Sequence, residues 1–354
     1  MENKIFRIDR EYLNQLRDMI AGVDSNNIFE DDIYNLDTFI HRITNNYNDI
    51  SNDKKIMSNL RDNMGMYHSY KDLYPYIRKL LRSYLVFNRS IVPQYEEINI
   101  SDSDAVLIAK EFFSKQDKFF SDSFNEFLDD DIHDHLEFIT PSLNTDGEMT
   151  YVKSTGDAFV VVPNYKGLNK ASILIHESEH VIDCFNNPDF FDNRIIRECA
   201  SMFMELISTN YINDLYNLDD DGALRRLSIH SIIKMDSRYI YFKNQLLSIA
   251  NRYKDLNSNG LKKILDYYAY SYDDIYRLND TLLVHDYYYQ ISYLIAIELY
   301  NLYYKDKRSA LEILKYIIMN CNDNNIFSVL NKLGITLNSS VKEYEKELEL
   351  KIEL

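Results

Sequence analysis

The sequence predicts a mainly α-helical protein, and three observations support this fold class. The 354 residues include only 8 Gly and 5 Pro, so few positions interrupt a helix. Apolar residues recur at three- and four-residue spacings over long stretches, which is the period of a helix with one buried face. The clearest strand is the short run D-A-F-V-V-V-P at 157–163. We therefore expect a compact helical fold with one small β-sheet.

The helices can be followed along the chain by their buried faces and start signals. One face of the first predicted helix carries Tyr12, Leu13, Leu16, Met19 and Ile20. The same spacing continues in Y-P-Y-I-R-K-L-L-R-S-Y-L-V-F at 74–87. A further helix is expected to begin at S-D-S-D, residues 101–104, because Ser and Asp cap helix N-termini and acidic charges favour the first turn. After residue 190 the helical pattern returns and persists almost to the end.

The domain organisation follows from the lack of internal repeats and flexible linkers in the sequence. We expect one compact unit, with an N-terminal helical segment over 1–60 and the main domain over 61–340. The tail over 341–354 is rich in Glu and Lys and predicts a solvated helix.

Composition limits the partners and the compartment. The net charge of −17 repels phosphate backbones and anionic lipids, so neither nucleic acid nor a membrane is expected as a partner. Cys184, Cys199 and Cys321 are too few and odd in number for a disulfide framework, which fits a reducing compartment. The charged start M-E-N-K-I-F-R-I-D-R lacks the apolar core of a signal peptide, and no apolar run is long enough to span a bilayer. We expect a cytoplasmic protein, and the sequence leaves its oligomeric state open.

The segment I-L-I-H-E-S-E-H-V-I-D-C-F, residues 173–185, carries the strongest chemical signal. His176 and His180 are four residues apart, so on a helix they lie on one face about a turn from each other. Two neutral imidazoles in that arrangement can bind one metal ion, and Glu177 can reach the same space without being a ligand. A hydrolytic zinc site needs these groups: nitrogen ligands, and a carboxylate that takes a proton from water. Two ordinary surface histidines on a helix are the alternative.

A third ligand candidate follows the helix break at N-N-P-D, residues 186–189. Glu198 lies 18 residues after the second histidine, on a predicted helix over 192–208 that would pack antiparallel to the first. Ser201 and Glu205 share the face of Glu198, at i+3 and i+7. Their side chains are expected to contact the metal ligands and orient them, without binding the metal themselves. Two His, one Glu and a water complete a tetrahedral site, so the sequence predicts one Zn²⁺ per chain.

Three sequence elements occur in a fixed order: N-Y-K-G at 164–167, H-E-S-E-H at 176–180 and E-C-A-S-M-F-M-E at 198–205. They resemble the oligoendopeptidase F and thimet oligopeptidase superfamily of zinc peptidases. In that family a strand ending N-aromatic-x-G leads into a helix with H-E-x-G-H. A later helix carries E-x-A-S-x-F-x-E, whose first Glu is the third zinc ligand. The agreement of three elements in order and spacing is far more specific than the histidine motif alone.

The resemblance implies a helical metallopeptidase fold, with a small antiparallel β-sheet beside the active-site helix and a catalytic domain over 61–340. It implies His176, His180 and Glu198 as zinc ligands and Glu177 as the general base. The chain is shorter than typical members, chiefly on the N-terminal side. A more open cleft is therefore expected, one that admits a dedicated precursor or leader peptide as well as short oligopeptides.

The segment H-D-Y-Y-Y-Q-I-S-Y-L at 285–294 resembles the family's Tyr-rich segment, in which His and Tyr side chains bind substrate and stabilise the oxyanion. On this resemblance Tyr289, Tyr293 and His285 are catalytic candidates, and Tyr287 is a substrate-binding candidate. Positioned O–H or N–H donors favour the charge that develops on the attacked carbonyl oxygen. With 30 Tyr in the chain, ordinary packing is the alternative for each of them.

The sequence thus predicts a zinc-dependent endopeptidase, with a peptide as its substrate and partner. The strand at 157–163 is expected to hold that peptide extended by backbone pairing, with Phe159 and Val161 as substrate-binding residues. The alternative is a catalytically silent protein that binds peptides and keeps its zinc. The presence of Glu177 disfavours it, because a silent descendant has no need of the base.

The inner letters of H-E-S-E-H depart from the family, which usually has Gly in place of Glu179. On the helix, Glu179 is one turn after His176, at the rim of the metal face. We expect its carboxylate to favour a basic or polar substrate residue near the scissile bond. A solvated side chain turned away from the site is the alternative.

Overall fold

The computed structural model of the chain describes residues 6–22, 30–44, 98–128, 135–140, 147–164, 167–218, 286–323 and 325–335. The chain divides into two compact units. The first comprises residues 1–48, 92–223 and 296–335, and the second residues 49–91, 224–295 and 336–354. The elements discussed below belong to the first unit, apart from the N-terminal half of one helix. The domain boundaries expected near residues 60 and 340, the helix at 74–87 and the charged tail lie outside the described residues.

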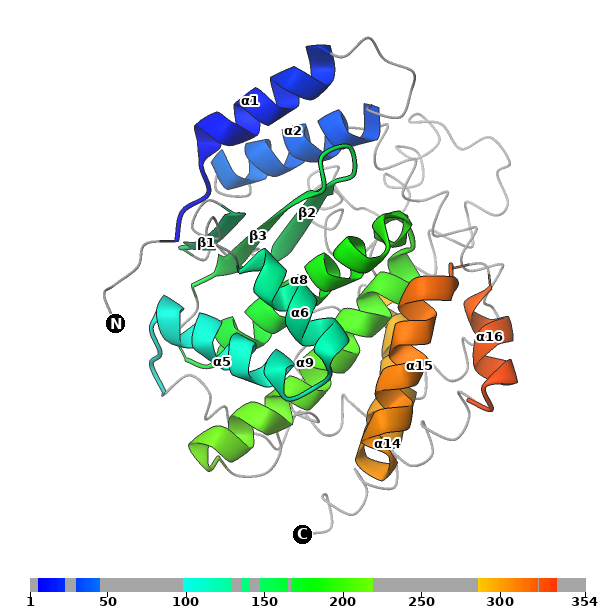
Figure 1. Cartoon of the computed structure of the whole chain (residues 1–354). Helices are drawn as coiled ribbons and strands as arrows, with labels where there is room; N and C mark the ends of the chain where they lie inside the picture. The colour runs from blue at the N-terminus through cyan, green and yellow to red at the C-terminus, as the bar shows by residue number, and fades with distance from the viewer. Residues whose placement is uncertain are drawn as a thin grey trace, which may run out of the picture. The chain divides into compact units, whose positions relative to one another are not determined.

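The described elements are mainly helical, which confirms the predicted fold class (Figure 1). In chain order they are α1 (Arg10–Gly22), α2 (Glu30–Thr44), α5 (Asp102–Ser114), α6 (Lys118–Phe127), β1 (Leu136–Ile139), β2 (Glu148–Val152), β3 (Asp157–Pro163), α8 (Asn169–Asn186), the 3-10 helix η3 (Pro188–Asp192), α9 (Arg194–Tyr216), α14 (Asp286–Lys305), α15 (Lys307–Asn320) and α16 (Ile326–Lys332).

The three described strands form one sheet in the order β1-β3-β2. β3 coincides with the predicted strand at 157–163 and runs antiparallel to β2, with Glu148 opposite Val161. On its other side β3 runs parallel to β1, with Leu136 opposite Val160. The sheet is therefore mixed, and the expectation of a wholly antiparallel sheet was wrong at β1. A parallel neighbour requires a crossover connection, and the predicted strand carries no signal for one.

One face of the sheet is covered by α1 and α2, which share a hydrophobic core with it (Figure 1). The predicted buried face of α1 is confirmed for Leu13, Leu16 and Ile20, and Tyr12 packs against the same core. The prediction that Met19 is buried was wrong, because its side chain is 56% exposed. The two helices are thus tied to the sheet by apolar burial, the main driving force for such packing.

The helix α8 packs against β2, β3, α5, α6 and α9. Its start follows Gly167, whose φ of 88° lies in the left-handed region that glycine adopts without strain. The start of α5 is confirmed as predicted: Ser101 and Asp104 form a capping box. Because α8 is enclosed on several sides, residues 174–184 are all buried, including the whole H-E-S-E-H segment. Among the described residues, no helix has the length and apolar character needed to cross a membrane.

Candidate metal centre

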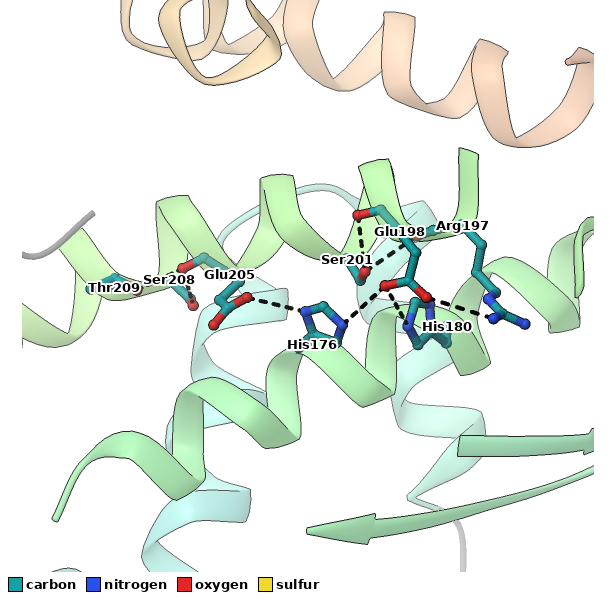
Figure 2. A network of polar contacts seen from close by, with 8 residues as sticks. All are labelled: His176, His180, Arg197, Glu198, Ser201, Glu205, Ser208 and Thr209. Atoms are coloured by element: carbon teal, nitrogen blue, oxygen red, sulfur yellow. Dashed lines mark hydrogen bonds and ion pairs between the residues drawn. The ribbon is translucent and has the colours of Figure 1, made fainter. Parts of the chain in front are cut away.

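The site is built where α8 and α9 lie side by side. His176 and His180 point from α8 toward Glu198 of α9, and one ligand atom from each of the three lies within 4.8 Å of the other two (Figure 2). Their pairing also fixes the direction of the helices. The earlier histidine meets Glu205 and the later one meets Glu198, so α8 and α9 run antiparallel, as predicted.

The two oxygens of Glu198 face different partners. Oε2 lies 3.6 Å from Nε2 of His176 and 3.8 Å from Nε2 of His180. Oε1 lies 3.6 Å from Nη2 of Arg197, the preceding residue on α9. These separations are too long for hydrogen bonds. Two imidazole nitrogens and one carboxylate oxygen thus face a common point without being bonded to one another.

The remaining ring nitrogens of the two histidines differ. Nδ1 of His176 lies 3.1 Å from Oε2 of Glu205, the position in which a carboxylate orients a metal-binding imidazole (Figure 2). Nδ1 of His180 is buried and has no hydrogen-bond partner among the described residues. Among the described residues, the expected supporting contact is therefore present for His176 but not for His180.

The Ser201 side chain, expected to support a ligand, makes its described hydrogen bonds within its own helix. Its hydroxyl donates to the backbone carbonyls of Arg197 and Glu198, at 3.2 Å each. Ser and Thr in helices often bond back to their own helix in this way. In the described structure the hydroxyl therefore bonds to α9 itself, and the expectation that Ser201 supports a ligand side chain stays a prediction.

Burial and charged neighbours shift the pKa values of His176, His180 and Glu198 in opposite directions. These three residues are called the ligand group below. Burial lowers the pKa of His176, but Glu198 and Glu205 outweigh it and raise that pKa to about 10. Burial lowers the pKa of His180 well below its usual value, and Glu198 offsets this only in part. The pKa of Glu198 is lowered well below its usual value: burial raises it, but the two histidines and Arg197 prevail. The group as a whole therefore favours a positive charge between its members.

Glu177, the predicted base, is buried at 7% exposure beside this group. Burial is the largest cause that raises its pKa, to about 8, and the carboxylates of Glu198 and Glu148 add to the effect. A base with a raised pKa holds a proton more readily at neutral pH. Its carboxylate also meets the backbone at Gly147: a methyl group built on that glycine would lie 2.5 Å from Oε1 of Glu177.

Glu179 does not lie at a rim. Its side chain is fully buried at 0% exposure, so neither the substrate-facing position nor the solvated alternative is correct. Its carboxylate and that of Asp183, one turn later on α8, have no hydrogen-bond partner among the described residues. Burial raises the pKa of each well above its usual value, and Glu179 raises that of Asp183 further. Elements packed against α8 cover the face that carries Glu179. The helical period alone does not show whether that face is covered.

The strand expected to bind substrate is closed on both edges. β3 pairs with β1 on one side and β2 on the other, so its backbone groups are already bonded within the sheet. Phe159 and Val161 are 0% exposed and belong to the core shared with α1 and α2. Neither can contact a peptide, and their prediction as substrate-binding residues was wrong. A continuous run of apolar residues indicates a strand that is buried on both faces, and β3 is such a strand.

The catalytic candidates of the Tyr-rich segment remain predictions. His285 and the side chains of Tyr287 and Tyr289 lie outside the described residues. Tyr293 is a buried residue of α14. It belongs to the second unit, whereas the ligand group belongs to the first.

Three residues of the site were missed by the sequence reasoning. Arg197 lies beside Glu198, Asp183 forms the buried acidic pair with Glu179, and Gly147 contacts Glu177. Asp183 follows Glu179 by four residues, and that spacing could have revealed it. Gly147 lies 30 residues before Glu177, and nothing in the local sequence connects the two.

Comparison with known proteins places the fold. No protein-family model and no curated protein matches the chain. Among solved structures, PZ peptidase A with an inhibitor is 13% identical, with a TM-score of 0.52 over 98% of this chain and 70% of that one. A Bacillus anthracis structure provisionally assigned as an oligoendopeptidase F is 15% identical, with a TM-score of 0.45 over 97% of this chain and 67% of that one. A Chlamydophila abortus structure provisionally assigned as a peptidase is 13% identical, with a TM-score of 0.45 over 96% and 62%.

The likeness to PZ peptidase A shows the fold. The chain has the fold of PZ peptidase A, which agrees with the peptidase fold that the resemblance in sequence implied. It spans about two thirds of the length of these structures.

Proposed function

We propose that this protein is a zinc-dependent endopeptidase that hydrolyses oligopeptides or a dedicated precursor or leader peptide. The observation that carries the proposal is the convergence of His176, His180 and Glu198 across two packed helices of a peptidase fold. Glu177 follows the first of them directly. Metal-assisted peptide hydrolysis needs both functions, a site for a metal and a base beside it.

The donor set fits zinc. Two imidazole nitrogens and one carboxylate oxygen are the ligands of many catalytic zinc sites, which keep the fourth position open. Oε2 of Glu198 is buried without a hydrogen bond among the described residues, and both histidine Nε2 atoms face it. A buried polar atom left in that state is unfavourable unless another group satisfies it. Zinc bound there would supply a Lewis acid that lowers the pKa of water and polarises the scissile carbonyl.

The protein's own residues would handle the proton and hold the ligands. Glu177 takes a proton from the attacking water on its carboxylate and passes it to the leaving amine. Glu205 accepts from Nδ1–H of His176, so that the lone pair of Nε2 is directed at the ligand group. Tyr289, Tyr293 and His285 remain the candidates for donors to the oxyanion.

A peptide strand would have to pair with an edge other than those of β3. Among the described residues, β2 is an edge strand of the sheet, and it packs against α8. Its first residue, Glu148, is close enough to Glu177 to raise the pKa of that base. We therefore assign the pairing role expected for β3 to β2 instead, where an extended peptide would lie near the base.

Replacing Glu177 with Gln tests the mechanism. We expect one zinc per chain by elemental analysis, as in the wild type, and loss of cleavage of a quenched peptide library. Glu126→Gln, at an exposed position of α6, is the matched control and should cleave normally. Full activity of Glu177→Gln would contradict the role of the base.

The same library separates the catalytic protein from a silent one. A wild-type protein that holds zinc and binds peptides without cutting any would be a peptide-binding protein. Mass-spectrometric mapping of the cut sites, with each segment offered as a short peptide and within a folded protein, distinguishes oligopeptides from a dedicated larger substrate.

A further inference from the structure

The backbone just before β2 lies directly against the predicted base. A Cβ atom built on Gly147 would be 2.5 Å from Oε1 and 2.8 Å from Cγ of Glu177. It would also be 2.6 Å from Cγ2 of Ile173, one turn earlier on α8. Contacts this short do not occur between real side chains, so a residue other than glycine would have to displace something.

The need for glycine at this position is one of space. The glycines of the described chain with positive φ are Gly156, Gly167 and Gly334, and Gly147 is not among them. Its backbone conformation is therefore open to other residues. What excludes a side chain is the close approach of the strand to α8, a recognised use of glycine within a sheet.

Neither side of this contact can move away freely. β2 is held in register by β3, with Glu148 paired to Val161 directly after the glycine. On the other side, α8 is enclosed by α5, α6 and α9 as well as by the sheet. The bare Cα of Gly147 therefore lies across the side chains of Ile173 and Glu177, which are neighbours at i and i+4 on α8.

We propose that Gly147 is a positioning residue for Glu177, which fixes where the carboxylate of the base can lie and keeps water from one side of it. This inference rests on the proposed function, because it gives the carboxylate a catalytic task. Proton transfer depends on placement, and a shift of about 1 Å in a catalytic group can lower the rate about 100-fold. Glu177 is not among the predicted ligands, so its displacement should leave the metal in place.

Gly147→Ala is the direct test. We expect kcat on a cleaved library peptide to fall by about 10- to 100-fold. KM, and the zinc affinity measured by chelator competition, should stay within about 3-fold of the wild type. Gly22→Ala is the matched control, because a Cβ at Gly22 meets nothing within 4 Å, and it should leave kcat unchanged. Unchanged kcat in Gly147→Ala, or a loss of zinc affinity in step with kcat, would overturn the proposal.

A thermal cycle tests the contact without any activity. In an Ile173→Ala background, which removes the other close contact, Gly147→Ala should lower Tm, and it should lower Tm much less when Glu177 is also Ala, because Cγ and Oε1 are then absent. An equal loss of Tm in both backgrounds would contradict the contact. If the wild type cleaves no peptide, the proposed function fails while this cycle still reports on the contact.

A second variant covers the case in which Gly147→Ala does not fold. Ile173→Ala removes the competing contact at a half-buried position, so the double variant Ile173→Ala/Gly147→Ala leaves Glu177 as the group that must move. We expect this double variant to fold, bind zinc and lose kcat relative to Ile173→Ala alone. Equal kcat in the two would overturn the proposal.

Discussion

One helix, α8, buries two pairs of ionisable side chains, and the two pairs have opposite surroundings. His176 and His180 face Glu198 and Glu205 of α9 at distances between 3.1 and 3.8 Å. Glu179 and Asp183 lie on the same helix with the same four-residue spacing, and their carboxylates have no hydrogen-bond partner among the described residues. Burial is common to both pairs. The difference lies in what the neighbouring helix offers to each.

The comparison explains why the histidine pair is a candidate metal site and the acidic pair is not. Carboxylates opposite the imidazoles favour positive charge, whether from a proton or from a metal ion, so the group can exchange one for the other. For the acidic pair, burial raises both pKa values, and Glu179 raises that of Asp183 further. Such a pair stays protonated to a higher pH and has no charge to offer a cation.

The largest expected effect comes from removing a partner of the histidine pair. Glu205→Ala leaves Nδ1 of His176 without its acceptor, so the ring loses the tautomer and the orientation that it needs as a ligand. We expect zinc affinity to fall by about 10- to 100-fold, measured by competition with a chelator.

Ser201→Ala on the same helix is its control. The Ser201 hydroxyl bonds only to carbonyls of its own helix in the described structure, so its removal should leave zinc affinity within about 3-fold. An equal loss of affinity in both variants would show that general damage to α9, rather than the contact with His176, is the cause.

The acidic pair should appear in the pH dependence of stability. The pKa of Asp183 is raised in the folded protein by burial and by Glu179, although Arg197 opposes the shift, and the Cys199 thiol also lies nearby. The folded state therefore keeps a proton that the unfolded chain loses above its ordinary pKa. Stability from this group is present at low pH and is lost as pH rises from about 4 through the raised value, by about 1.4 kcal/mol per pH unit.

Asp183→Asn removes this dependence. We expect the variant to have a higher Tm than the wild type at pH 8, and a difference that shrinks toward pH 4. Each kcal/mol corresponds to a few degrees in Tm for a chain of this kind. A wild-type advantage that grows with pH would mean that Asp183 is ionised and partnered in the folded protein.

The smallest effect is expected at Glu179, where the sequence raised the expectation of substrate selectivity. Because its carboxylate is fully buried, Glu179→Gln should leave the preference for Lys over an uncharged residue near the cut within about 2-fold. The measurement is the ratio of kcat/KM for two peptides that differ only at that residue. A clear loss of the preference for Lys would restore the expectation that this carboxylate contacts substrate.

Much of the scaffold could be predicted because it depends on local sequence patterns. The strand at 157–163, the capping box at Ser101 and the buried stripe of α1 follow from residue type and spacing within a few positions. Met19 and the parallel pairing of β1 were the exceptions. Both depend on which neighbour covers a given face or edge, and no local pattern carries that information.

The sequence by itself determined which side chains can form a metal site, because the four-residue spacing of His176 and His180 places them on one helix face whatever surrounds it. It also placed Glu198 on the next helix, where a short turn makes an antiparallel return the natural one. Only the tertiary structure decided what covers the rest of α8. Packing buried Glu179, closed both edges of β3 and brought Gly147 against Glu177. These outcomes depend on contacts between residues far apart in the chain, which the periodicity of one helix cannot specify.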